Sequence, residues 1–271
     1  NNGNLLNLVF YVFTMLGTHE LFEMGKKSAY KNTLKLPALL LVTMLFIPLL
    51  LQTAARFYPG LLDHPILLFL NERFHIVLGI LITLWGIVIL GIVIMSYWIF
   101  RKEKIEFVFK NTFVFNFFYP VLPMWLLALA YTLTDSNTKV ILLVVLLPIY
   151  LNDTLAYVCG RLFGKTPLIP SVSPKKTREG FIGGMIGAAL VMLAILYFTG
   201  PFDLQHALAM VGISFLASIL ATLGDLFESK LKRSIDIKDS GNILPGHGGI
   251  LDRIDAMLFV APVLYVLLIL I

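Results

Sequence analysis

Long apolar runs divide this sequence and constrain its fold more than any other feature. Hydrophobic residues make up 58% of the chain and charged residues only 14%, too few to cover a soluble globule of 271 residues. Lipid requires each backbone hydrogen bond to be satisfied locally, and a membrane β-barrel would need short segments of alternating polarity. We therefore predict an all-α, polytopic integral membrane protein with about 8 transmembrane helices. They are expected at residues 4–22, 36–52, 74–100, 112–133, 138–158, 181–199, 206–228 and 254–271.

The placement of basic residues predicts how these helices are oriented. The successive connections carry 4, 2, 4, 1, 5, 0 and 5 lysines and arginines, which follows the positive-inside rule. Eighteen of the 21 basic residues would then face the cytoplasm, with both chain ends outside. The net charge of +5 is explained by this topology, so we do not expect nucleic acid as a partner.

Residues able to do chemistry are concentrated in the second half of the chain. We predict a scaffold of transmembrane helices over 1–135 and a catalytic transmembrane region over 136–271. Two cytoplasmic loops, 159–180 and 229–253, hold most of the loop glycines and charges. The single cysteine, Cys159, excludes a disulfide framework and a thiolate metal site, and we expect it to pack as a small residue.

A polar stripe in the seventh predicted helix leads to a carboxylate. Ser214, Ser218, Thr222, Asp225 and Ser229 are four, four, three and four residues apart, which places them on one helix face. We expect this face to point into the protein. The hydroxyls have an alternative role, because serine and threonine in membrane helices often bond their own backbone. A carboxylate at this depth needs a cation, so we predict a functional role for Asp225.

Three further aspartates are candidate metal ligands. Asp252 and Asp255 lie three residues apart at the start of the last predicted helix, where simple capping of the helix dipole is an alternative. With Asp225 they offer hard oxygen ligands from two helices, which suits Mg²⁺ shared with substrate phosphates. Asp153, in the fifth predicted helix, is a further candidate, with a structural hydrogen-bonded aspartate as the alternative. No Cys/His set with zinc spacing is present.

A glycine-rich run, residues 245–249, precedes the last predicted helix. Gly248 and Gly249 would let backbone N–H groups approach a phosphate. His247 would contact a phosphate or ribose, donate a proton, or only shape the loop. The other candidates of this loop are predicted to bind or neutralise the nucleotide: Lys232, Arg233, Lys238, Asp239 and Arg253.

The other cytoplasmic loop offers a second set of phosphate ligands. Residues 173–180 combine hydroxyls, cations and a glycine immediately before a predicted helix. A loop that is basic only for topology would look similar. We predict that four of its residues bind the nucleotide: Ser173, Lys175, Lys176 and Thr177.

Together these motifs resemble the signature of the phosphatidate cytidylyltransferase (CDP-diacylglycerol synthase) family. Residues 160–165 and 173–180 are also similar to the family, and the resemblance is strong over roughly 150–265 and weak before that. The signature residues are Ser229-x-Leu231-Lys232-Arg233, Lys238-Asp239-x-Gly241 and Leu244-Pro245-x-His247-Gly248-Gly249-Ile250-x-Asp252-Arg253-Ile254-Asp255.

The resemblance implies a membrane enzyme that joins CTP and phosphatidate to give CDP-diacylglycerol and pyrophosphate. It implies dependence on Mg²⁺, with K⁺ at a second metal position, and a paired-metal centre on Asp225 and Asp252 with Asp255 close by. It also implies a homodimer as the assembly. Two other readings remain open: a CTP-dependent kinase acting on a polyprenol-type lipid alcohol, and a membrane transporter with Asp153 and Asp225 on its pathway.

Overall fold

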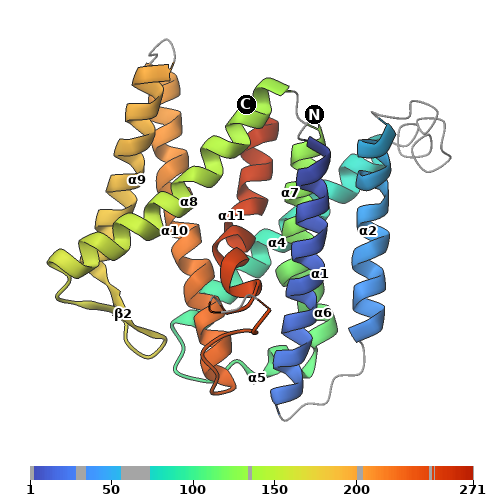
Figure 1. The fold of residues 1–271 in the computed structure, drawn as a ribbon, viewed down its shortest axis with the longest axis horizontal. Helices are drawn as coiled ribbons and strands as arrows, with labels where there is room; N and C mark the ends of the chain where they lie inside the picture. The colour runs from blue at the N-terminus through green and yellow to red at the C-terminus, as the bar shows by residue number, and fades with distance from the viewer. Residues whose placement is uncertain are drawn as a thin grey trace.

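The computed structural model is almost entirely helical, and every predicted apolar run coincides with helix (Figure 1). The structure describes residues 3–28, 35–55, 74–133, 136–199, 204–243, 246 and 248–270. The helices are α1 (Gly3–Lys27), α2 (Lys35–Ala55), α4 (Phe74–Ile99), α5 (Glu106–Lys110), α6 (Thr112–Asn116), α7 (Leu122–Leu133), α8 (Ser136–Phe163), α9 (Arg178–Thr199), α10 (Leu204–Ser234) and α11 (Leu251–Leu270). A π-helix, η2 (Phe117–Val121), joins α6 to α7 and contains Pro120.

Three helical stretches of the described chain are long and apolar enough to cross a membrane. They are Thr112–Leu129, Arg178–Phe198 and Ala207–Ser234, and shorter apolar helices cover Lys35–Leu50 and Gly86–Ile99. This composition fits a helical membrane protein.

The chain is mostly helical as predicted, but loop 159–180 contains two strands that the all-α prediction did not include. Strands β1 (Pro167–Ile169) and β2 (Ser173–Thr177) form an antiparallel hairpin there, with Pro167 paired to Thr177. Apolar periodicity could not reveal strands this short. The hairpin is fixed to the start of α9, because the Glu179 carboxylate accepts N–H bonds from Lys165 and Thr166 at 3.1 Å.

The loop predicted at 229–253 is shorter than expected, because the helices on both sides of it are longer. α10 continues to Ser234 instead of ending at residue 228, and α11 starts at Leu251. The Lys230 ammonium donates to the carbonyl of Arg101 at 2.6 Å, and Ser234 Oγ accepts the N–H of Ile105 at 2.9 Å. These contacts support the extra turns of α10, so the loop proper is residues 235–250.

α11 lies near the middle of the molecule and packs against α10 on one side and α7 on the other (Figure 1). Rings join these elements: Phe227 of α10 lies 5.4 Å from Tyr119 of η2 and 5.9 Å from Phe259 of α11, between centroids. This aromatic cluster fixes the height of α10 against α11, and therefore the relative height of their carboxylates.

Small residues allow α8 and α9 to pack in close contact. A Cβ on Gly183 would lie 2.6 Å from Cβ of Cys159, and one on Gly184 would lie 2.7 Å from the carbonyl of Asn152. Cys159 is a free thiol and packs as the small residue that was predicted. This close packing brings the middle of α8 beside the hairpin and α10.

The hairpin, residues 101–105 and the described part of loop 235–250 lie at one end of the molecule (Figure 1). The start of α1 and the end of α11 lie together at the opposite end. Basic loops gathered at one end agree with the alternation of charge in the sequence.

Candidate active site

The polar stripe of α10 faces the protein interior, as predicted. Ser214 and Ser218 are fully buried, and Thr222 is nearly so. Thr222 Oγ1 donates to the carbonyl of Ser218 at 2.9 Å, which is the self-bonding role expected as the alternative, and it accepts from Asn152 at 3.4 Å. At the end of the stripe, Ser229 Oγ donates to Asp225 at 3.4 Å.

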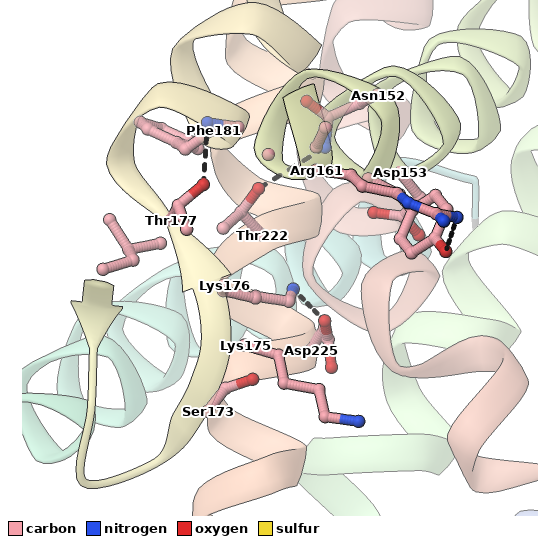
Figure 2. Close-up of a pocket in the computed structure, with 15 residues that line it drawn as sticks. Asn152, Asp153, Arg161, Ser173, Lys175, Lys176, Thr177, Phe181, Thr222 and Asp225 are labelled. Carbon is pink, nitrogen blue, oxygen red and sulfur yellow. Dashed lines mark hydrogen bonds and ion pairs between the residues drawn. The ribbon is translucent and has the colours of Figure 1, made fainter. Parts of the chain in front are cut away.

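A cavity of about 480 Å³ opens between α8, α9, α10 and the hairpin (Figure 2). The predicted residues of loop 159–180 lie in its wall, together with carboxylates from two helices. These wall residues are Asp153, Ser173, Lys175, Lys176, Thr177 and Asp225. Sequence reasoning therefore found residues from three separate segments that the fold brings to one cavity.

An ion pair crosses this cavity from the hairpin to α10. The Lys176 ammonium contacts the Asp225 carboxylate, and the two side chains are 29% and 28% exposed (Figure 2). Lys175 and Asp153 are exposed in the wall, whereas Thr177 Oγ1 accepts the Gly180 N–H at 3.1 Å and caps α9. The cavity thus presents both signs of charge, partly open to solvent.

Behind the cavity, three carboxylates from α10 and α11 converge. Carboxylate oxygens of Asp225, Glu228 and Asp255 lie within 4.8 Å of one another. Glu228 is fully buried and Asp255 is 8% exposed. The helices can approach here because a Cβ on Gly224 would lie only 2.5 Å from the carbonyl oxygen of Asp255. This close approach of two helices places the three side chains together.

Asp252 is held by donors from the protein itself. Its carboxylate accepts bonds from the Lys232 ammonium at 2.7 Å, from the Gly249 N–H at 2.8 Å and from the Ser240 N–H at 3.1 Å. Lys232 also forms an ion pair with Glu228, so it bridges α10 and α11. Gly248 has φ = +82°, and a Cβ there would lie 2.8 Å from the same carboxylate. Gly248 and Gly249 therefore both lie against the Asp252 carboxylate.

The other predicted residues of this region that the structure describes are exposed. They are Arg233, Lys238, Asp239 and Arg253, and Arg233 donates to the carbonyl of Ile237 at 2.8 Å. His247 lies outside the described residues, and its predicted contact with phosphate stays a prediction.

Comparisons with known proteins show the family of this chain. A model of the cytidylyltransferase family matches residues 2–271. The chain belongs to this family. Its curated relatives include the phosphatidate cytidylyltransferases of Staphylococcus haemolyticus (39% identical), Staphylococcus aureus strain COL (38%) and Staphylococcus saprophyticus (38%). Each alignment covers 69% of this chain and 70% of the relative.

Two residues of this cytidylyltransferase family member were missed by the sequence analysis. Glu228 joins Asp225 and Asp255 in the carboxylate cluster, and Glu20 of α1 contacts the start of α11. Both glutamates lie within predicted membrane helices, and an ionisable residue in such a helix is by that fact a candidate functional residue. Glu228 also lies three residues after Asp225, the spacing that places two side chains on one helix face.

Proposed function

We propose that this protein is a phosphatidate cytidylyltransferase, which transfers CMP from CTP to phosphatidate and releases pyrophosphate. One observation carries the proposal: Asp225 belongs both to the buried carboxylate cluster and to the wall of a cavity that contains lysines and hydroxyls. A site for phosphates and their metal ion needs carboxylates for the metal, and lysines and hydroxyls for the phosphate oxygens. The Staphylococcus relatives bear the name of the same activity.

The reaction needs charge control more than proton transfer. An oxygen of the phosphatidate phosphate attacks the α-phosphorus of CTP, the bond to the β-phosphate oxygen breaks, and pyrophosphate leaves in line. The nucleophile is already an anion, so the main barrier is repulsion between phosphates. Lys175 and Lys176 would offset that repulsion from the cavity wall. Ser173, which also lines the wall, would donate to a phosphate oxygen.

The carboxylate cluster fits a divalent cation, and we propose Mg²⁺. Both oxygens of Glu228 are buried without a hydrogen-bond partner among the described residues, although Lys232 forms an ion pair with one. The charges also leave room for a cation. The site contains two lysines and four carboxylates: Lys176 and Lys232, and Asp225, Glu228, Asp252 and Asp255. With every group ionised, two negative charges remain, which a divalent cation would offset.

Mg²⁺ bound there would neutralise charge on the nucleotide phosphates. Asp225, Glu228 and Asp255 would hold it. Direct ligation by Asp252 or Asp153, and K⁺ at a second position, are proposals from the family resemblance and the sequence.

A second cavity of about 270 Å³ offers a path for the lipid. It shares Leu168, Phe181 and Thr222 with the first cavity, and its lining is otherwise mostly apolar. Arg178 is its charged lining residue within the described chain. We propose that an acyl chain of phosphatidate lies here while the phosphate reaches Asp225.

We further propose that the protein crosses the membrane several times, with its basic loops and active site facing the cytoplasm. We also propose that it assembles as a homodimer.

Product analysis tests this function directly. Purified protein in detergent is incubated with phosphatidate, Mg²⁺ and CTP labelled in the cytidine, and lipid and aqueous products are separated. We expect labelled CDP-diacylglycerol with one pyrophosphate per product, lost on chelation of the metal. CDP release on addition of a lipid alcohol would indicate the kinase instead. Solute flux in liposomes without CTP would indicate the transporter.

A further inference from the structure

The N-terminal helix α1, predicted as scaffold, contributes a buried carboxylate to the structure around the active site. Glu20 is 2% exposed. Its Oε1 accepts the Ile250 N–H at 2.9 Å, and its Oε2 accepts the Leu251 N–H at 2.8 Å and Ser240 Oγ–H at 3.1 Å. In the described chain its hydrogen-bond partners are therefore backbone amides and a hydroxyl from more than 200 residues away.

The contacts of Glu20 satisfy the start of α11. The first N–H groups of a helix have no partner within the helix and carry partial positive charge. α11 begins at Leu251, so Glu20 caps it from another helix. The N–H groups of Ile250 and Leu251 and the Ser240 hydroxyl satisfy the buried carboxylate, which offsets part of the cost of burying it.

Two glycines of the signature leave room for this carboxylate. A Cβ on Gly241 would lie 2.5 Å from Oε1 of Glu20, and one on Gly249 would lie 2.5 Å from Oε2. Any side chain at either position would push Glu20 away. The sequence analysis assigned Gly249 to phosphate binding, whereas its absent side chain makes room for Glu20.

Glu20 and Asp252 hold the same segment from opposite sides. Ser240 donates its hydroxyl to Glu20 and its N–H to Asp252. Gly249 donates its N–H to Asp252, and the next residue, Ile250, donates to Glu20. Movement of Glu20 would therefore shift the donors of Asp252 and the first turn of α11.

We propose that Glu20 is a positioning residue of the active site, which holds the start of α11 so that Asp252 and Asp255 are aligned for the nucleotide and its metal. The proposal rests on the proposed function. It gives α1, which the sequence analysis placed in the scaffold, a part in positioning the site.

A comparison of two glutamates on one helix tests this role. Glu20→Gln replaces one accepting oxygen by an NH₂ group that faces other donors. Glu23→Gln makes the same chemical change three residues away, where the side chain is 37% exposed and bonded to lysines. Each variant is measured for kcat, KM for CTP, half-saturating Mg²⁺, and the rise in thermal midpoint caused by CTP with Mg²⁺.

For Glu20→Gln we expect half-saturating Mg²⁺ to rise on the order of 10–100-fold per folded enzyme, with a smaller thermal rise on ligand binding. Glu23→Gln should match the wild type. If Glu20→Gln lowers only the ligand-free thermal midpoint and leaves Mg²⁺ and CTP dependence as in Glu23→Gln, the residue is merely structural and the proposal is wrong.

A second variant keeps the test decisive if Glu20→Gln does not fold. Ser240→Ala removes one donor to Glu20 and leaves the charge in place, and it should shift half-saturating Mg²⁺ in the same direction by a few-fold. An unchanged value would overturn the proposal. Absence of turnover in the wild type would reject the proposed function instead, and the ligand-induced thermal rise would still decide the role of Glu20.

Discussion

The wall of the main cavity and the layer packed behind it both contain carboxylates and lysines, but in different surroundings. In the wall, Lys176 and Asp225 are each more than a quarter exposed and form a single pair. Behind it, Glu228 is fully buried, and Lys232 contacts two carboxylates at once. Asp225 of the wall and Glu228 of the packed layer are three residues apart on α10, so one helix contributes to both regions.

This difference indicates which residues can exchange partners. A partly exposed ion pair gains little from its contact, since water screens it, so the arrival of a phosphate can separate the pair at small cost. A buried network resists such exchange, because removal of one member leaves a charge unpaired in a medium of low polarity. We expect the wall residues to act mainly on the reaction, whereas the packed residues also contribute strongly to stability besides holding the proposed metal.

The largest expected effect is at Asp225, which belongs to both regions. Asp225→Asn removes a negative charge from the proposed metal site, and we expect turnover to fall on the order of 10³-fold, with thermal stability little changed. Asp236→Asn is the matched control, because this aspartate is 82% exposed, and asparagine suits its φ of +56°. Near-normal synthesis of CDP-diacylglycerol by Asp225→Asn would contradict the assignment.

The next effect separates the regions by stability. Lys232→Met leaves Glu228 and Asp252 without their shared cation, so we expect a loss of about 3–5 kcal/mol in the free energy of unfolding. Lys176→Met, in the wall, should cost less than about 1 kcal/mol. Thermal unfolding of both variants in one detergent measures the difference. Equal losses would remove the distinction between wall and packed layer.

A third effect concerns catalysis in the wall. Lys176→Met removes a cation that faces the phosphates, and we expect kcat/KM for CTP to fall on the order of 10²-fold in folded enzyme. Lys102→Met is a suitable control, since Lys102 is an exposed lysine in the basic segment 101–105. If both lysine variants behave alike, Lys176 supplies only general positive charge.

The sequence predicted the features that depend on local pattern. Each predicted apolar run coincides with helix in the described chain, and spacing along α10 predicted that Ser214, Ser218 and Thr222 face inward. Charged residues in a membrane segment are costly enough to stand out without a structure, which is why Asp225 was found. Residues 173–177 were found because cations and hydroxyls cluster there before a helix.

What the sequence could not predict depends on contacts between distant segments. Glu20 contacts residues 230 and 231 positions later, and no local pattern links α1 to α11. The hydrogen bonds that Asp252 accepts from Lys232 and from two backbone amides depend on the path of loop 235–250, which no local pattern reveals. The hairpin escaped prediction because three- and five-residue strands carry too short a pattern to be detected.

The smallest expected effect is at Glu23, the exposed counterpart of buried Glu20. Its hydrogen bonds to Lys26 and Lys35 lower the pKa of the carboxyl from 4.5 to about 2. A lowered folded-state pKa adds stability above the unfolded value of 4.5, and this is lost as the pH falls towards 2.

Because the Glu23 side chain is 37% exposed, screening should keep its contribution below about 1 kcal/mol at neutral pH. The difference in thermal midpoint between wild type and Glu23→Gln should therefore be small at pH 7, decrease below pH 4.5 and shrink further in high salt. The loss caused by Lys232→Met should persist in the same salt, because buried charges are screened much less. A salt-resistant effect at Glu23 would place it with the packed residues and weaken its use as the control for Glu20.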